Sequence, residues 1–141
     1  MYFIKNTILK QIKDTIGKAP IESGGILGLK DNVICAYYFD KGDFCKIDEY
    51  RPNIKKLNSV INEWGNKGIS FIGIIHSHPN SYKIPSLQDC NYVDVLMKQN
   101  RFLEKIILPI VIIENNDVQI YYYEYLQQVK DFSSIDVLIM E

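Results

Sequence analysis

The segment that decides the fold runs from residue 69 to residue 79 and reads Ile-Ser-Phe-Ile-Gly-Ile-Ile-His-Ser-His-Pro. Its first seven residues are rich in β-branched and aromatic side chains and carry no charge. This composition predicts a central strand that is covered on both faces. The two histidines of the chain, His76 and His78, stand two residues apart where this strand ends. Side chains at i and i+2 of a strand point to the same face, so both imidazoles should project together.

The segments around this strand alternate between helical and strand-like patterns. Apolar residues with a helical period predict helices over residues 4–16, around 57–64, and over 86–100. The predicted strands cover residues 25–29, 33–40, 69–77, 107–114 and 118–126, with a weaker strand at 45–50. The tail after Gln127 has no clear pattern. This order predicts an α/β fold with a mixed β-sheet packed by helices on both faces, in three layers.

Composition limits the class of protein. The 141 residues, 47% of them apolar, suit a single domain over residues 1–141 with a hydrophobic core. The net charge is -1 and no block of like charges stands out, which argues against nucleic acid or an anionic membrane as a partner. The longest apolar run, residues 106–113, is too short to span a bilayer. Lys5 and Lys10 interrupt any signal-peptide core, so we expect a cytoplasmic protein.

The three cysteines, Cys35, Cys45 and Cys90, show no Cys-x-x-Cys spacing of a structural zinc or redox site. We expect reduced thiols in a cytoplasmic protein. Cys90 follows Asp89, but the next residue of a helix points about 100° away. We therefore expect Cys90 to be a small core residue rather than a metal ligand.

The histidine pair has the features of a metal site. It lies at the carboxyl end of the predicted central strand, where open α/β sheets place their sites. Two imidazoles, one carboxylate and a water form a common catalytic zinc shell. Asp89, in the first turn of the next helix and on the same stripe as Val93, can supply the carboxylate. Ser86-x-x-Asp89 is also a capping-box pattern, and the two interpretations are partly compatible.

A hydrolytic zinc site also needs a base for its water. Glu22 precedes a Gly-Gly pair at a predicted strand start, where small residues let a substrate or another backbone approach closely. The segment alone is more typical of a surface glutamate. A zinc deaminase would need His-x-Glu with Pro-Cys-x-x-Cys, and a zincin His-Glu-x-x-His, and neither motif occurs.

Taken together, residues 76–79 (His-Ser-His-Pro), 86–89 (Ser-x-x-Asp) and Glu22 upstream resemble the signature of the JAMM (MPN-plus) metalloproteases. The similarity is greatest to the short bacterial JAB-type members. It implies a fold similar to cytidine deaminase and cleavage of peptide or isopeptide bonds, often after the C-terminal glycine of a ubiquitin-like protein. It also implies that His76, His78 and Asp89 ligate Zn²⁺, that Glu22 transfers protons, and that Ser86 donates a hydrogen bond to the oxyanion.

The expected function is therefore a zinc peptidase or isopeptidase acting on the tail of a ubiquitin-like or sulfur-carrier protein. Two alternatives remain: a catalytically silent scaffold of the same fold that binds a protein partner, and a zinc hydrolase of a small amide. The sequence leaves the oligomeric state open. The charged segment 40–50 is a candidate sheet edge for pairing with an extended substrate, or else an ordinary solvated loop.

Overall fold

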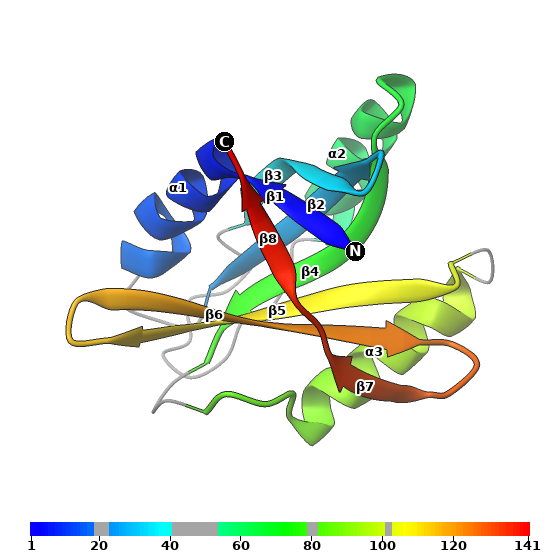
Figure 1. Ribbon diagram of the computed structural model, residues 1–141. Helices are drawn as coiled ribbons and strands as arrows, with labels where there is room; N and C mark the ends of the chain where they lie inside the picture. The colour runs from blue at the N-terminus through cyan, green and yellow to red at the C-terminus, as the bar shows by residue number, and fades with distance from the viewer. Residues whose placement is uncertain (19–22, 41–53, 79–81, 101–102) are drawn as a thin grey trace.

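The fold is a mixed sheet with helices on both of its faces, seen in a computed structural model that describes residues 1–18, 23–40, 54–78, 82–100 and 103–141 (Figure 1). In chain order the elements are β1 (Tyr2–Lys5), α1 (Asn6–Asp14), the 3-10 helix η1 (Ile16–Lys18), β2 (Gly24–Lys30), β3 (Val33–Asp40), α2 (Ile54–Asn66), β4 (Ser70–Ser77), α3 (Leu87–Gln99), β5 (Lys105–Glu114), β6 (Asp117–Leu126), β7 (Asp131–Ser134) and β8 (Val137–Met140).

The strands form one eight-stranded sheet in the order β7-β6-β5-β4-β2-β3-β1-β8. Strand β4 runs parallel to β5, and β1 runs parallel to β3 and β8, while the other pairs are antiparallel. The two edge strands, β7 and β8, are joined by residues 135–136 alone, so the sheet has to curl to bring its edges together. The Tyr2 hydroxyl donates to Glu124 Oε2 at 2.9 Å and so links β1 to β6 across the curl.

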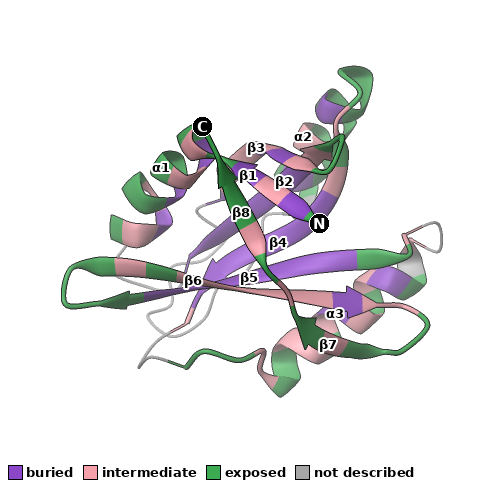
Figure 2. Ribbon diagram, viewed as in Figure 1, coloured by how far each residue is buried: buried purple, intermediate pink, exposed green. Residues whose placement is uncertain are grey.

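Helices cover both faces of the curled sheet, as expected. Inside the curl, Ile8 and Ile12 of α1 pack with the sheet residues Ile34 and Ile75. On the outer face, α2 and α3 contribute buried side chains to two further clusters, among them Leu57, Trp64, Val93 and Met97. Figure 2 shows the central strands buried between these layers. The predicted fold class, a three-layer α/β arrangement with a mixed sheet, is confirmed.

The predicted first helix is wrong at its start. Ile4 belongs to strand β1, and the helix begins at Asn6, after an extended Lys5. Isoleucines recur every four residues across the junction between β1 and α1, because Ile4, Ile8, Ile12 and Ile16 are all buried in the same inner cluster. Pairing of β1 with β3 and β8, both distant in sequence, outweighs the local helical period.

The predicted strands at 25–29 and 33–40, and at 107–114 and 118–126, are confirmed, and each pair forms an antiparallel hairpin, β2–β3 and β5–β6. Their turns place Asp31 and Asn32, and Asn115 and Asn116, at positive φ between 51° and 64°. Tight hairpin turns need this conformation, and Asn and Asp tolerate it best after glycine. The unassigned tail forms β7 and β8, which extend the two edges of the sheet.

Several expectations concern residues outside the described part of the chain, namely the weak strand at 45–50, most of the candidate edge at 40–50, and Cys45. Among the described residues, Cys35 and Cys90 are both free thiols. The expectation of a core position for Cys90 is wrong, because the residue is only partly buried near the helix start. No helix within the described ranges has the length and apolar character needed to cross a bilayer.

Candidate metal centre

A bulge in β4 sets the face on which the histidines lie. Ile74 pairs with Ile26 and Phe71 with Gly28, so β4 has one residue more than β2 over this stretch. As a result Phe71 and Ile74 both pack in the outer cluster although they are three residues apart. A side chain at Gly73, within the bulge, would collide with the carbonyl oxygen of Ile107. Glycine at position 73 therefore lets β5 approach β4 closely beside the bulge, and the extra residue of β4 puts Ile74 and His76 on the outer face.

Backbone pairing on both sides fixes the His76-Ser77-His78 segment. The Ser77 N–H donates to the Ser23 carbonyl at 2.9 Å, and the Ser23 N–H donates to Ser77 Oγ at 3.1 Å. On the β5 side, the His78 N–H donates to the Val111 carbonyl at 3.1 Å. Ser77, which lies between the two histidines, thus binds Ser23, the residue that follows Glu22 in the sequence.

The start of α3 brings the carboxylate to the histidines. Ser86 is the N-cap, and its Oγ accepts from the Asp89 N–H at 3.0 Å. The Ser86 N–H in turn donates to Asp89 Oδ2 at 2.8 Å, which completes a capping box. The predicted capping interpretation is therefore confirmed, and it orients the same carboxylate that faces the imidazoles.

The three side chains converge on one point. Asp89 Oδ1 lies 3.2 Å from His76 Nε2, and Oδ2 lies 3.0 Å from His78 Nε2. The two Nε2 atoms are 2.7 Å apart. Ligands on a tetrahedral Zn²⁺ with bonds of 2.0–2.1 Å are roughly 3.3 Å from one another. A small expansion of the cluster would therefore fit a zinc ion, and the group is of the His-His-Asp type that could hold a metal.

The electrostatics of the cluster favour an ionised carboxylate. Burial opposes the charge on Asp89, but hydrogen bonds from His76 and His78 and from the Ser86 N–H hold its pKa well below the usual range. His76 is buried, with 7% of its surface exposed. The cluster thus offers an anionic oxygen and two imidazoles in a site with little access for water.

A backbone carbonyl orients one of the histidines. His78 Nδ1 donates to the Tyr82 carbonyl oxygen at 2.9 Å. Because this carbonyl keeps a proton on Nδ1, loss of the Nε2 proton that is shared with Asp89 leaves a neutral His78 whose lone pair faces the cluster, as a metal ligand must. The Tyr82 ring lies beside the imidazole, with centroids 5.5 Å apart. The sequence prediction missed this contact, because a carbonyl carries no sequence signal.

A row of tyrosines on β6 supports the loop that carries this carbonyl. Tyr123 donates its hydroxyl proton to the Lys83 carbonyl at 2.6 Å, one residue after Tyr82. Lys83 Nζ lies over the Tyr121 ring, 5.4 Å from its centroid. On α3, Asp94 Oδ1 accepts from the Tyr125 hydroxyl at 3.3 Å. Alternate tyrosines on a strand predict one aromatic face, although the sequence does not reveal what that face contacts.

We expect Tyr123→Phe to weaken zinc binding by up to roughly 10-fold, at the lower limit of the effects seen for outer-shell partners. The change removes the hydrogen bond to the Lys83 carbonyl. The neighbouring Tyr82 carbonyl, which accepts from His78, is then held less firmly. Competition titration with a zinc chelator measures the affinity, and Tyr121→Phe is the matched control because it keeps the ring beneath Lys83. Equal zinc affinities for the two variants would contradict this role of Tyr123.

The family comparison matches residues 5–123 to the model for prokaryotic homologues of the JAB domain. This match covers most of the chain, including β4, α3 and the residues of the cluster. The chain belongs to this family. The resemblance predicted from the His-x-His and Ser-x-x-Asp motifs is thereby confirmed.

Solved structures share the fold of this JAB domain. Protein DSY2949 from Desulfitobacterium hafniense has a TM-score of 0.75 at 14% identity, over 100% of this chain and 94% of that one. AF2198, a JAB1/MPN domain protein from Archaeoglobus fulgidus, has a TM-score of 0.55 at 16% identity, over 100% and 98%. A third structure, described as a JAMM metalloprotease-like zinc site in the proteasome and signalosome, has a TM-score of 0.52 at 18% identity, over 100% and 99%. A comparison with curated proteins gave no significant match.

Within this JAB domain the predicted residues fall into two groups. His76, His78, Asp89 and Ser86 come together at the end of β4 and the start of α3. Glu22 lies outside the described residues, and its role stays a prediction. The observed contact of Ser86 is its cap, so its catalytic role is likewise a prediction.

Proposed function

We propose that this JAB domain is a zinc-dependent peptidase or isopeptidase that acts at the C-terminal glycine tail of a ubiquitin-like or sulfur-carrier protein. The observation that carries the proposal is the convergence of two imidazole nitrogens and a carboxylate within 4.8 Å of one another. The neighbour described as a metalloprotease-like zinc site supports zinc as the metal.

In this proposal His76, His78 and Asp89 hold the metal. When bound, zinc supplies an acidified water and a polarised scissile carbonyl. The capping box and the Tyr82 carbonyl hold two of these ligands in place before the metal arrives. This preorganisation limits the entropy lost on binding, since the ligand side chains are already oriented.

Glu22 is the proposed base. Gly24 pairs with His76, and Ser23 is bound to Ser77, so β2 is in register with the end of β4. Glu22 precedes Gly24 by two residues in the sequence, so β2 leads from Glu22 to the metal cluster. A carboxylate there can accept a proton from the water and donate it to the leaving amine.

Ser86 is the proposed oxyanion donor. Its Oγ already accepts the Asp89 N–H, which leaves the hydroxyl proton free to be donated. The residue lies at the N-terminus of α3, where the helix dipole also favours negative charge. Charge that develops on the scissile carbonyl would be stabilised by this donor.

Cleavage of a defined substrate tests the proposal. The zinc-loaded protein is incubated with glycine-tailed ubiquitin-like and sulfur-carrier proteins linked to a lysine side chain or extended by a peptide, and products are read by mass spectrometry. We expect cleavage after the terminal glycine, lost with a chelator and restored by zinc. Cleavage of small amides alone would favour the small-amide hydrolase. Tail binding without cleavage by the zinc-loaded protein would favour the scaffold.

Zinc occupancy should fall in acid. Both imidazoles must be neutral to ligate, and an ordinary imidazole has a pKa of about 6.5. Asp89, whose pKa is held low, stays ionised over the same range, so loss of zinc reports on the histidines. Dialysis between pH 7.5 and pH 5 followed by elemental analysis measures the occupancy. An occupancy that stays flat over this interval would contradict ligation by two imidazoles.

A further inference from the structure

Strand β8 forms an open edge of the sheet. Among the residues that the structure describes, β8 pairs with β1 on one side and ends the sheet on the other. Its Leu138, Ile139 and Met140 are 49%, 57% and 38% exposed, and Figure 2 shows most of the strand at the surface. The strand contains no charge and no proline, the residues that usually keep an edge strand from pairing with another chain.

The opposite edge strand, β7, is protected by polar residues. It begins with the charged Asp131, and its Ser133 and Ser134 are exposed. Its one apolar side chain, Phe132, packs against the outer clusters. The sheet therefore has one polar edge and one apolar edge, and the apolar edge is the one suited to a further strand.

The inner cluster is uncovered at this apolar edge. Ile139 is the register partner of Ile4, which is 1% exposed and lies in the inner cluster. Two residues earlier, Val137 packs against the same cluster. Alternation places Ile139 on this face as well, although more than half of its surface is exposed. A strand added beside β8 would extend the cluster and bury Ile139.

We propose that the added strand is β8 of a second copy of this chain, paired antiparallel about a two-fold axis at Ile139. Such an axis stands perpendicular to the sheet, so every side chain stays on its own face. Opposite residues must then be identical or an even number of positions apart. With the axis at Ile139, this residue lies opposite its copy, and Leu138 lies opposite the partner's Met140. On the inner face, Ile4 and Ile139 of both copies then form one continuous row.

The charges at the ends of β8 suit pairing with a second copy. Asp136 and Glu141 flank the strand five positions apart, an odd number, so no symmetric register sets these two acidic residues directly opposite each other. Lys5 is the register partner of Met140 at the end of β8, whereas Asp136 precedes its start, and both charged residues are exposed. Antiparallel pairing brings the end of one strand beside the start of the other. Lys5 therefore approaches the partner's Asp136, and opposite charges on neighbouring strands favour pairing.

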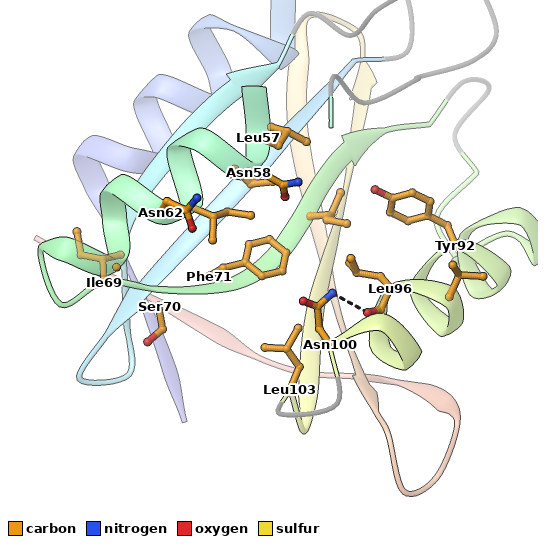
Figure 3. Close-up of a pocket in the computed structure, with 15 residues that line it drawn as sticks. Leu57, Asn58, Asn62, Ile69, Ser70, Phe71, Tyr92, Leu96, Asn100 and Leu103 are labelled. Atoms are coloured by element: carbon orange, nitrogen blue, oxygen red, sulfur yellow. Dashed lines mark hydrogen bonds between the residues drawn. The ribbon is translucent and has the colours of Figure 1, made fainter. Parts of the chain in front are cut away.

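The dimer leaves the metal cluster accessible. Strands β2, β3 and β1 separate β4, which carries the histidines, from β8. A cavity of about 910 Å³ lies between α2 and α3 on the outer face, and among the described residues its lining includes none from β1 or β8 (Figure 3). Zinc binding should therefore be the same in the monomer and the dimer. This independence lets the dimer be tested apart from the proposed function.

The interface is small, so the dimer should be weak. Only four residues of each strand pair, far fewer than the roughly 20–30 residues a side of a standard interface. Because standard interfaces already extend to micromolar affinity, we expect a Kd of about 1 μM or weaker. Sedimentation equilibrium of the zinc-loaded chain over about 5–500 μM covers this range.

Charge exchange at Ile139 tests the two-fold contact. Ile139→Lys and Ile139→Glu each set like charges opposite each other and remove the buried isoleucine pair, so each should raise the Kd at least roughly 10-fold. An equimolar mixture of the two variants sets opposite charges there and should return the Kd to within about 3-fold of the wild type. Val129→Lys is the control, at an apolar residue that is 62% exposed and lies outside β8. It should dimerise as the wild type does.

Thermal melts and zinc content, measured on the same preparations, show that each variant is folded. A wild-type chain that stays monomeric throughout the concentration range would overturn the proposal and leave β8 to a different strand. A dimer that both charged variants leave intact would also overturn it, because the contact would lie elsewhere. Monomeric variants that do not recombine when mixed would overturn the two-fold register at Ile139.

Discussion

Glu22→Gln should retain zinc and lose at least roughly 10²–10⁴-fold in turnover, the range attributed to general acid–base catalysis. An amide has nearly the size of the carboxylate but cannot accept the proton of the attacking water. The measurements are the rate of tail cleavage and zinc content on the same preparation. Zinc content separates the loss of a base from the loss of the metal.

Glu63→Gln is the matched control for this variant. Glu63 of α2 forms an exposed i,i+4 ion pair with Lys67, which directly follows the helix, with Nζ 3.6 Å from Oε1. Exposed pairs of this type contribute little to stability, so its turnover should equal that of the wild type. Near-normal turnover in Glu22→Gln would mean that another group serves as the base.

The second large effect is expected for Asp89→Asn, which should weaken zinc binding by at least about 100-fold, beyond the range known for outer-shell residues. The amide oxygen is neutral, and two imidazoles without an anionic partner hold zinc poorly. An Asn oxygen can still accept the Ser86 N–H, so the capping box is partly retained and the helix should form. Chelator competition gives the zinc affinity, and a thermal melt of the metal-free protein reports on the fold.

Asp94→Asn is the control on the same helix. Asp94 pairs with Lys98 at 2.9 Å and accepts a hydrogen bond from Tyr125, and it follows Asp89 by five residues, about 140° around the helix. It should bind zinc as the wild type does. An Asp89→Asn variant with the affinity of this control would show that Asp89 is a capping residue and not a ligand.

The cluster could be predicted from the sequence because its parts are local. The end of a buried strand and the first turn of the next helix are each marked by a short motif, and alternation on a strand orients His76 and His78 together. The capping box fixes Asp89 from residues within four positions. Such features depend little on the rest of the chain.

The remaining features depend on contacts between distant segments. The pairing of β1 with β8 joins the two ends of the chain and turns Ile4 from a helical residue into a strand residue. The bulge in β4 follows from the register with β2, which no local period reports. His78 is oriented by a main-chain group, the Tyr82 carbonyl. The loop that carries this carbonyl is held at Lys83 by Tyr123, which lies on a strand 40 residues away. Local patterns carry no information about these partners.

The most direct test of the account is zinc K-edge X-ray absorption on protein loaded with one zinc per chain. The account predicts nitrogen and oxygen ligands at about 2.0–2.1 Å, including the multiple-scattering pattern of two imidazoles, and no sulfur at about 2.3 Å. The imidazole pattern should fall by half or vanish with the metal in His78→Ala. A sulfur ligand, which Cys90 beside Asp89 could supply, or an unchanged spectrum in His78→Ala, would contradict a centre built from His76, His78 and Asp89.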